Sequence, residues 1–350
     1  MRRLLPAALA ALLIWPALGA GARTVGFQDW LAISADLEDR RLVWSESATV
    51  RLDPSDAGRD LPRGLRPFVY YRVHVASARL DRTRRGFAGQ PDQLLALRTQ
   101  IARMTSGHIA GTGSAGFVVM PHSSRFAVPV VWCCDDDIET VVYSDGRADA
   151  ARHLAAAVDG EVVRAVVRDG DGAALLTGDP RERIPALARA AFPGTPSARR
   201  VAMARGLVAW VDDEDRRGLR FGVPTDAGVI AERSVALPGE ALRVWADRGL
   251  VVVAVRQNDR IALVRIDVAG PRQRVVWRGT RLPRVGLGEG TVAVGDGRDI
   301  LAGRGAPLRR VTRARGRVAA VAPSGRRVAW FERVRRKGER RTVARIGRLR

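Results

Sequence analysis

The best guide to the fold is GLVAWV at residues 206–211, a glycine followed by a short apolar run. Related runs follow along the chain: GLVVVA at 249–254, GTVAV at 290–294 and GRRVAW at 325–330. Their starts lie 43, 41 and 35 residues apart. Each run precedes a polar turn and a second strand-like run, so each unit reads as a hairpin. A period of about 40 residues indicates repeated small sheets.

The same unit is present near the N-terminus, where RRLVWSE at 40–46 parallels RRVAWFE at 326–332. Seven intervals of about 41 residues fit between Trp44 and Trp330. One small sheet cannot bury both of its faces, whereas sheets packed radially can. We therefore predict an all-β fold, a single β-propeller over residues 23–350 with about seven four-stranded blades, or between six and eight. We expect the tryptophans to lie in the core between blades.

One segment departs from the repeat. After Pro91, apolar residues recur at Leu94, Leu97, Ile101 and Met104, a spacing typical of a helix. This pattern predicts a short helical insertion near residues 91–105.

The first 22 residues have the three parts of a cleavable signal peptide. A positive pair, Arg2-Arg3, precedes an uncharged apolar run, and Ala20-Gly21-Ala22 forms a small-x-small cleavage site. The apolar run is shorter than the roughly 20 residues that a transmembrane helix requires. We predict Sec-type export with cleavage after Ala22, a secreted or periplasmic location, and no transmembrane anchor after cleavage.

The net charge of +22 is concentrated at the C-terminal end. The last 50 residues contain 16 arginines and one lysine but only two acidic residues. Codon preference explains arginine in place of lysine, but not the excess of positive charge. The candidate anion-binding surface is a basic hairpin formed by Arg333, Arg335, Arg336, Lys337, Arg340 and Arg341. The alternative is a solvated basic edge that discourages aggregation.

The two cysteines, Cys133 and Cys134, are adjacent. Neighbours on a regular strand point to opposite faces, so a bond between them requires a turn and a distorted peptide. Three interpretations remain open: two structural thiols, a strained vicinal disulfide, or a redox site. The spacing is not that of a zinc or thioredoxin-like motif.

No motif in the sequence indicates a catalytic, metal or cofactor site. The spacing of the four histidines fits no metal motif; they are His74, His108, His122 and His153. GTGSAG at 111–116 matches a dinucleotide-binding pattern, but a strand-like run follows it where that motif requires a helix. Acidic clusters at 135–139 and 212–215 lack the ligand ladder of a calcium loop, so we expect loops and hairpin tips there.

APSGRRVAW at 322–330 resembles the S-P-D-G-x-x-h-a-F/W repeat of TolB-like, WD40-like propellers. Ala322 and Ser324 depart from that pattern, and no other unit retains its Pro-Asp-Gly turn. The resemblance implies a periplasmic or extracellular binding platform whose partners dock on a propeller face. It carries over no catalytic residue.

We therefore expect an exported, non-enzymatic, monomeric propeller that binds a protein or an anionic envelope polymer. Export and the lack of interleaved aromatic residues argue against nucleic-acid binding. The alternative is an exported propeller enzyme, such as a hydrolase, a lyase or a quinoprotein-like oxidoreductase, with its site at the central channel.

Overall fold

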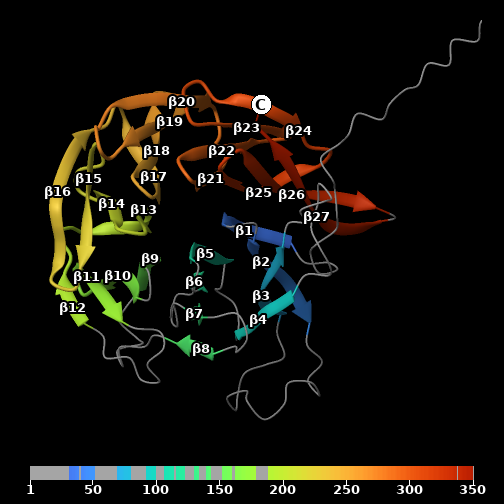
Figure 1. Ribbon diagram of the computed structural model, residues 1–350, viewed down its shortest axis with the longest axis horizontal. Coiled ribbons are helices and arrows are strands. Elements are labelled where there is room, and N and C mark those ends of the chain that lie inside the picture. The colour runs from blue at the N-terminus through green and yellow to red at the C-terminus, as the bar shows by residue number, and fades with distance from the viewer. Residues whose placement is uncertain are drawn as a thin grey trace, which may run out of the picture.

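The computed structural model describes residues 31–38, 41–51, 69–79, 92–99, 106–113, 116–122, 130–133, 139–142, 152–159, 162–178, 188–336 and 338–349. Their secondary structure consists of strands, with no helix. The strands form seven antiparallel sheets that stand around a ring (Figure 1). The protein is a β-propeller, and each sheet is one blade.

The first three blades lie between residues 31 and 191. Blade 1 consists of β1 (Leu31–Glu38), β2 (Arg41–Arg51), β3 (Val69–Arg79) and β4 (Asp92–Thr99). Blade 2 consists of β5 (Ser106–Gly113), β6 (Gly116–His122), β7 (Val130–Cys133) and β8 (Glu139–Val142). Blade 3 consists of β9 (Arg152–Asp159), β10 (Val162–Asp169), β11 (Gly172–Gly178) and β12 (Ala188–Ala191).

The other four blades are continuous in the sequence. Blade 4 consists of β13 (Pro196–Ala204), β14 (Leu207–Asp212), β15 (Gly218–Thr225) and β16 (Gly228–Ala236). Blade 5 consists of β17 (Glu240–Asp247), β18 (Leu250–Gln257), β19 (Arg260–Asp267) and β20 (Gln273–Gly279). Blade 6 consists of β21 (Arg284–Gly288), β22 (Thr291–Asp296), β23 (Asp299–Gly303) and β24 (Arg309–Arg313). Blade 7 has three described strands, β25 (Arg317–Ser324), β26 (Arg327–Arg336) and β27 (Glu339–Arg348).

The repeated glycine marks the turn between the first and second strands of a blade. Gly206, Gly249, Gly290 and Gly325 all have positive φ, between 53° and 71°. Glycine adopts this conformation without the steric cost that a side chain brings. The repeat read from the sequence is therefore confirmed in blades 4 to 7.

Within a blade, alternate residues of the central strands pack against opposite neighbouring blades. On β18, Val251 and Val253 join the core shared with blade 4, while Leu250 and Val252 join the core shared with blade 6. This arrangement explains why β14 and β18 are almost entirely apolar, since both of their faces are buried. Trp44, Trp210 and Trp330, each on a second strand, are fully or almost fully buried, as predicted.

Side-chain packing between blade 1 and blade 7 closes the ring. Leu42 and Trp44 share a core cluster with Ala329 and Phe331. The rings of Trp44 and Phe331 lie 5.4 Å apart between centroids. The first and last repeats of the chain thus bury one another.

The first strand of each blade lies nearest the centre of the ring (Figure 1). The pairing of these strands with their neighbours is irregular in most blades. The register shifts at residue 33 of β1, 154 of β9, 242 of β17 and 319 of β25, which is the third residue of each strand. Such β-bulges add a residue to one strand and redirect the side chains beside it.

Two sequence predictions require correction. The helix predicted near 91–105 is wrong where the chain is described, because Asp92–Thr99 is strand β4, paired with β3. Six intervals rather than seven separate Trp44 from Trp330, because the N-terminal blades are longer than the C-terminal ones.

The predicted signal peptide, residues 1–22, lies outside the described residues. In the described part of the chain, no helix is long and apolar enough to span a membrane.

Candidate functional site

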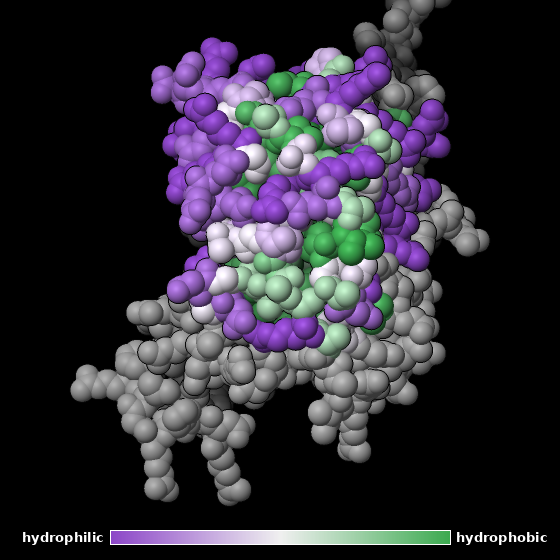
Figure 2. Space-filling model, turned by 90° about the vertical axis from the view of Figure 1, so that its left-hand side faces the viewer, coloured by the Kyte–Doolittle hydropathy of each residue, from purple (hydrophilic) through white to green (hydrophobic). Residues whose placement is uncertain are grey.

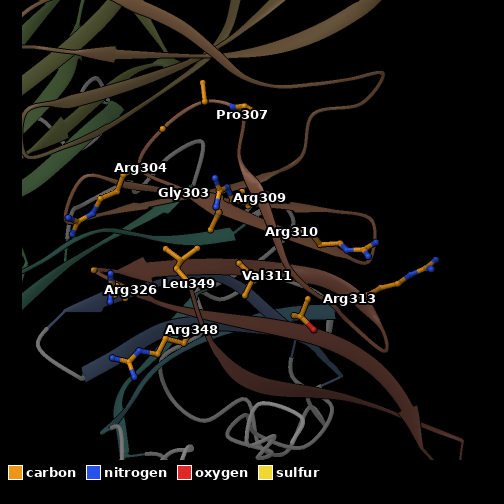
Figure 3. Close-up of a pocket in the computed structure, with 15 residues that line it drawn as sticks. Gly303, Arg304, Pro307, Arg309, Arg310, Val311, Arg313, Arg326, Arg348 and Leu349 are labelled. Atoms are coloured by element: carbon orange, nitrogen blue, oxygen red, sulfur yellow. The ribbon is translucent and has the colours of Figure 1, made fainter. Parts of the chain in front are cut away.

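A cleft of about 1150 Å³ lies between blades 6 and 7. One wall is the end of β23, the loop at 304–307 and strand β24. The other wall is the turn at 325–326 and the end of β27. Figure 3 shows Val311 and Leu349 near its middle, and both pack against the core cluster shared by the two blades. The cleft therefore has an apolar floor.

The rim of the cleft is strongly positive. Six arginines line it and no carboxylate does; they are Arg304, Arg309, Arg310, Arg313, Arg326 and Arg348. In Figure 3, Arg304, Arg326 and Arg348 lie toward one end, while Arg310 and Arg313 extend from the other. Guanidinium groups bind carboxylate and phosphate oxygens through paired hydrogen bonds. The cleft thus offers several such groups above an apolar surface.

One weak ion pair partly balances this charge. Arg310 Nη1 lies 3.9 Å from Asp299 Oδ1, and the Arg310 side chain is 66% exposed. Among the described residues we find no carboxylate paired with Arg309, Arg326 or Arg348. These guanidinium groups are therefore available to an anion without breaking a strong internal contact.

Hydrogen bonds hold the two walls together. The buried Thr291 hydroxyl donates to the Gly325 carbonyl at 2.9 Å and accepts from Arg304 Nε at 3.5 Å. On the far wall, the Leu349 amide donates to the Arg326 carbonyl at 2.7 Å. Because these contacts join blade 6 to blade 7 and fix the end of the chain, the positions of the walls are defined before any ligand binds.

The predicted basic hairpin is the far end of β26 and β27, which projects beyond the ring (Figure 1). Gly338 has a φ of +84° and forms the turn, as predicted, while Lys337 lies outside the described residues. Arg335 and Arg340 occupy directly opposed positions across the two strands. Like charges at opposed positions disfavour each other.

The structure places the other predicted hairpin residues as follows. Arg333 and Arg335 are exposed. Arg336 pairs in register with Glu339, and Arg341 with Val334. Whether this hairpin binds an anion stays a prediction.

The cleft and the hairpin tip are two separate surfaces. They lie at opposite ends of β26 and β27, which are ten residues each, or about 30 Å at the usual strand rise. Sequence reasoning placed the binding surface at the hairpin and missed the cleft. The charge excess after residue 301 was the available signal, but the cleft arginines come from several separate segments that only the fold brings together.

The remaining candidates from the sequence have these positions. Cys133 ends β7 and Cys134 lies outside the described residues, so the disulfide stays a prediction. The GTGSAG segment runs from the end of β5 into the start of β6, where Gly113 pairs with Gly116, and no helix follows. The described part of the chain has no group of three or more His, Cys, Asp or Glu residues that could hold a metal ion.

The acidic run at 212–215 forms the turn between β14 and β15, as expected for a hairpin tip. Two of its four carboxylates are paired with arginines: Asp213 pairs with Arg200, and Asp212 lies 3.1 Å from Arg220.

The opposite side of the ring has a different surface. Figure 2 shows that it is largely hydrophilic, with a small apolar area. Val223 and Ile230, opposed across β15 and β16, are 41% and 54% exposed. Nothing in the structure indicates what would cover them.

Known proteins resemble this chain in fold but not in sequence. No protein-family model and no curated protein matches the sequence. A puromycin-hydrolysing peptidase of Mycobacterium tuberculosis is 14% identical, with a TM-score of 0.53 over 90% of this chain and 52% of that one. An uncharacterised protein of Listeria monocytogenes is 6% identical, with a TM-score of 0.50 over 89% of this chain and 91% of that one.

BamB from Moraxella catarrhalis is a more distant match, with 13% identity and a TM-score of 0.42 over 91% of this chain and 84% of that one. At such identities the similarity concerns the fold alone. Function must therefore be argued from the surfaces of this chain.

Proposed function

We propose that the protein is an exported, non-enzymatic β-propeller that acts as a binding platform for an anionic macromolecule, in the cell envelope or outside the cell. The observation that carries the proposal is the cleft between blades 6 and 7, which six arginines line without a carboxylate. The favoured partner is an anionic envelope polymer, and an acidic protein surface is the alternative that the experiment below distinguishes.

Two features of the sequence support the location and the role. Residues 1–22 have the composition of a signal peptide. The APSGRRVAW unit at 322–330 resembles the repeat of TolB-like propellers, which implies a platform that docks partners. This unit contains the turn at 325–326, which forms one wall of the cleft.

The geometry suits an extended anionic chain better than a small substrate. The arginines are spread along the cleft instead of converging on one point (Figure 3). Arginine forks can follow successive anionic groups of a polymer, and the apolar floor can contact the segments between them. Attraction between exposed charges is screened by salt, so such binding should weaken as ionic strength rises.

The test is binding of the full chain to labelled polyphosphate and to labelled poly-glutamate, measured by fluorescence anisotropy at low and at physiological salt. The cleft variant is R309Q/R326Q/R348Q. The proposal expects salt-sensitive binding that this variant weakens at least roughly tenfold, equivalent to about 1.4 kcal/mol. Preference for polyphosphate would indicate an anionic polymer, and preference for poly-glutamate an acidic protein.

The matched control is R260Q/R272Q/R274Q, which removes the same charge from exposed arginines of blade 5. Equal loss of binding in both variants would show that net charge, and not the cleft, attracts the polymer. A third variant, R335Q/R336Q/K337Q/R340Q, tests the hairpin separately. No binding by the unmodified chain at low salt would overturn the proposal.

A further inference from the structure

Strand β17 contains one residue that has no partner on the neighbouring strand β18. Ala241 and Val244 belong to the core between blades 4 and 5, whereas Leu242 and Trp245 pack against the core between blades 5 and 6. Same-face residues of a regular strand are two apart, but these are three apart. The register against β18 shifts between Ala241 and Arg243, so Leu242 is the residue added by a β-bulge, and Arg243 lies directly beside it, opposite Ala254.

The guanidinium group of Arg243 lies over an aromatic ring. Its Cζ atom is 5.2 Å from the centroid of the Trp245 ring, within the range of a cation–π contact. The side chain is partly buried on a strand that borders the centre of the ring (Figure 1). The bulge and the tryptophan together hold a positive charge at this position.

Two further arginines, both exposed, lie on the inner strands that pack against β17 on either side. They are Arg199 on β13 and Arg284 on β21, the first strands of the two neighbouring blades. Burial lowers the pKa of Arg243 below its ordinary value, and the charges of Arg199 and Arg284 lower it further. No carboxylate among the described residues offsets this effect on Arg243.

The carboxylates of the same region are paired with other arginines. Glu240, three residues before Arg243, accepts a hydrogen bond from Arg216 at 2.7 Å. Asp213 accepts one from Arg200, the neighbour of Arg199. The cluster of Arg199, Arg243 and Arg284 is therefore unbalanced, although nearby acidic groups could have neutralised it.

We propose that Arg199, Arg243 and Arg284 form a second anion site, which binds a compact phosphate group at the inner strands of blades 4 to 6. Three positive charges from three blades suit one multivalent oxyanion, since each guanidinium can offer paired donors to its oxygens. The site is distinct from the cleft between blades 6 and 7, and it does not depend on the function proposed above.

The test uses the full chain with inorganic phosphate and, separately, with glycerol 3-phosphate, each compared with sodium chloride at equal ionic strength. Thermal unfolding and titration calorimetry are the measurements. A ligand that binds only the folded state raises Tm, and we expect a rise of roughly 2 to 4 °C at saturation. A stronger response to inorganic phosphate indicates the free ion, and a stronger response to the ester indicates a phosphorylated ligand.

Arg243→Gln should abolish the response to both ligands and change Tm without phosphate little, because the lost contact with Trp245 offsets the removal of a charge that its neighbours disfavour. Arg260→Gln, an exposed arginine of the same blade, is the control and should respond like the unmodified chain. The cleft variant R309Q/R326Q/R348Q should also keep the phosphate response. A response retained in Arg243→Gln, or an equal response to sodium chloride, would overturn the proposal.

Discussion

Glu332 is a fully buried carboxylate that joins three parts of blade 7. One oxygen accepts hydrogen bonds from the backbone amides of Arg315 and Gly316, at 2.8 and 3.4 Å, before strand β25. The other pairs with Arg345 on β27, whose side chain is 13% exposed. A buried charge is tolerated when its hydrogen bonds and its counter-charge are both present.

Blade 4 contains the same arrangement with a shorter acid. Asp212 accepts a hydrogen bond from the Thr195 amide at 2.8 Å, before β13, and lies 3.1 Å from Arg220. In both blades the acid follows a buried tryptophan by two residues, and the arginine pairs in register with that tryptophan. This contact links the entry to the first strand with the second and third strands.

We predict that Glu332→Gln lowers the free energy of unfolding by about 3 kcal/mol, because it leaves the Arg345 charge buried without a partner. The measurement is urea unfolding followed by circular dichroism. Asp212→Asn, at a more exposed pair, should cost only about 1–2 kcal/mol. The double variant E332Q/R345M should regain part of the loss, and strictly additive losses would contradict the role given to the pair.

At the scale of elements, blades 6 and 7 approach each other closely at the glycines of β21. A Cβ atom on Gly286 would overlap the carbonyl of Val321, and one on Gly288 would overlap the carbonyl of Pro323. The two inner strands β21 and β25 are therefore packed backbone to backbone. This close approach helps to set the distance between the two walls of the arginine cleft.

Gly288→Ala should destabilise the fold by about 2–3 kcal/mol, because the added methyl group forces the backbones of β21 and β25 apart. Gly270→Ala, where a Cβ meets nothing within 4 Å, should have little effect. Thermal unfolding compares the two. If the two variants unfold at the same temperature, the close approach does not stabilise the fold as described.

The element that sequence reasoning assigned wrongly has a clear physical explanation. Leu94 and Leu97 have the spacing of a helix, yet they lie on strand β4. The register of β4 against β3 shifts between Gln93 and Leu95, and a bulged strand also brings residues three apart to one face. Residues 92–99 form a strand and not a helix because they pair with β3, and the spacing of apolar residues alone cannot reveal this pairing.

At the scale of the whole molecule, the ring depends on contacts between blades more than on any single sheet. The second strands of blades 4 to 7 are buried on both faces, and the cluster around Trp44 and Phe331 joins blade 1 to blade 7. Repeat proteins are stabilised by such interfaces between neighbours. The closing interface is special because it connects residues almost 290 positions apart.

We predict that Phe331→Ala lowers the free energy of unfolding by about 3–5 kcal/mol, the usual cost of emptying a buried aromatic site. Phe221→Ala, which empties a similar site between blades 4 and 5, should cost a similar amount. Chemical unfolding monitored by fluorescence and by circular dichroism tests both. A much smaller loss for Phe331→Ala would show that closing the ring adds little stability.

The fold was predictable because its strongest signal is local: a glycine turn followed by an apolar run, as at Gly206 and Gly249. The binding surfaces were not predictable to the same extent. The cleft arginines come from strands or turns of two blades, and Arg243 acquires its neighbours only when β13, β17 and β21 lie side by side. Proximity of this kind depends on the order and curvature of the blades, which no local pattern encodes.

The closing interface also determines how the molecule should respond to mechanical force. Among the described strands no two blades share a hydrogen-bonded strand pair, but hydrogen bonds join blade 6 to blade 7, such as that from the Val318 amide to the Gly297 carbonyl at 3.1 Å. Packed side chains slide past one another under a lower load than hydrogen-bonded strands loaded in shear. A polymer attached to blade 7 and pulled away would therefore strain the boundary with blade 1 first. The ring should open there while the other blades remain intact.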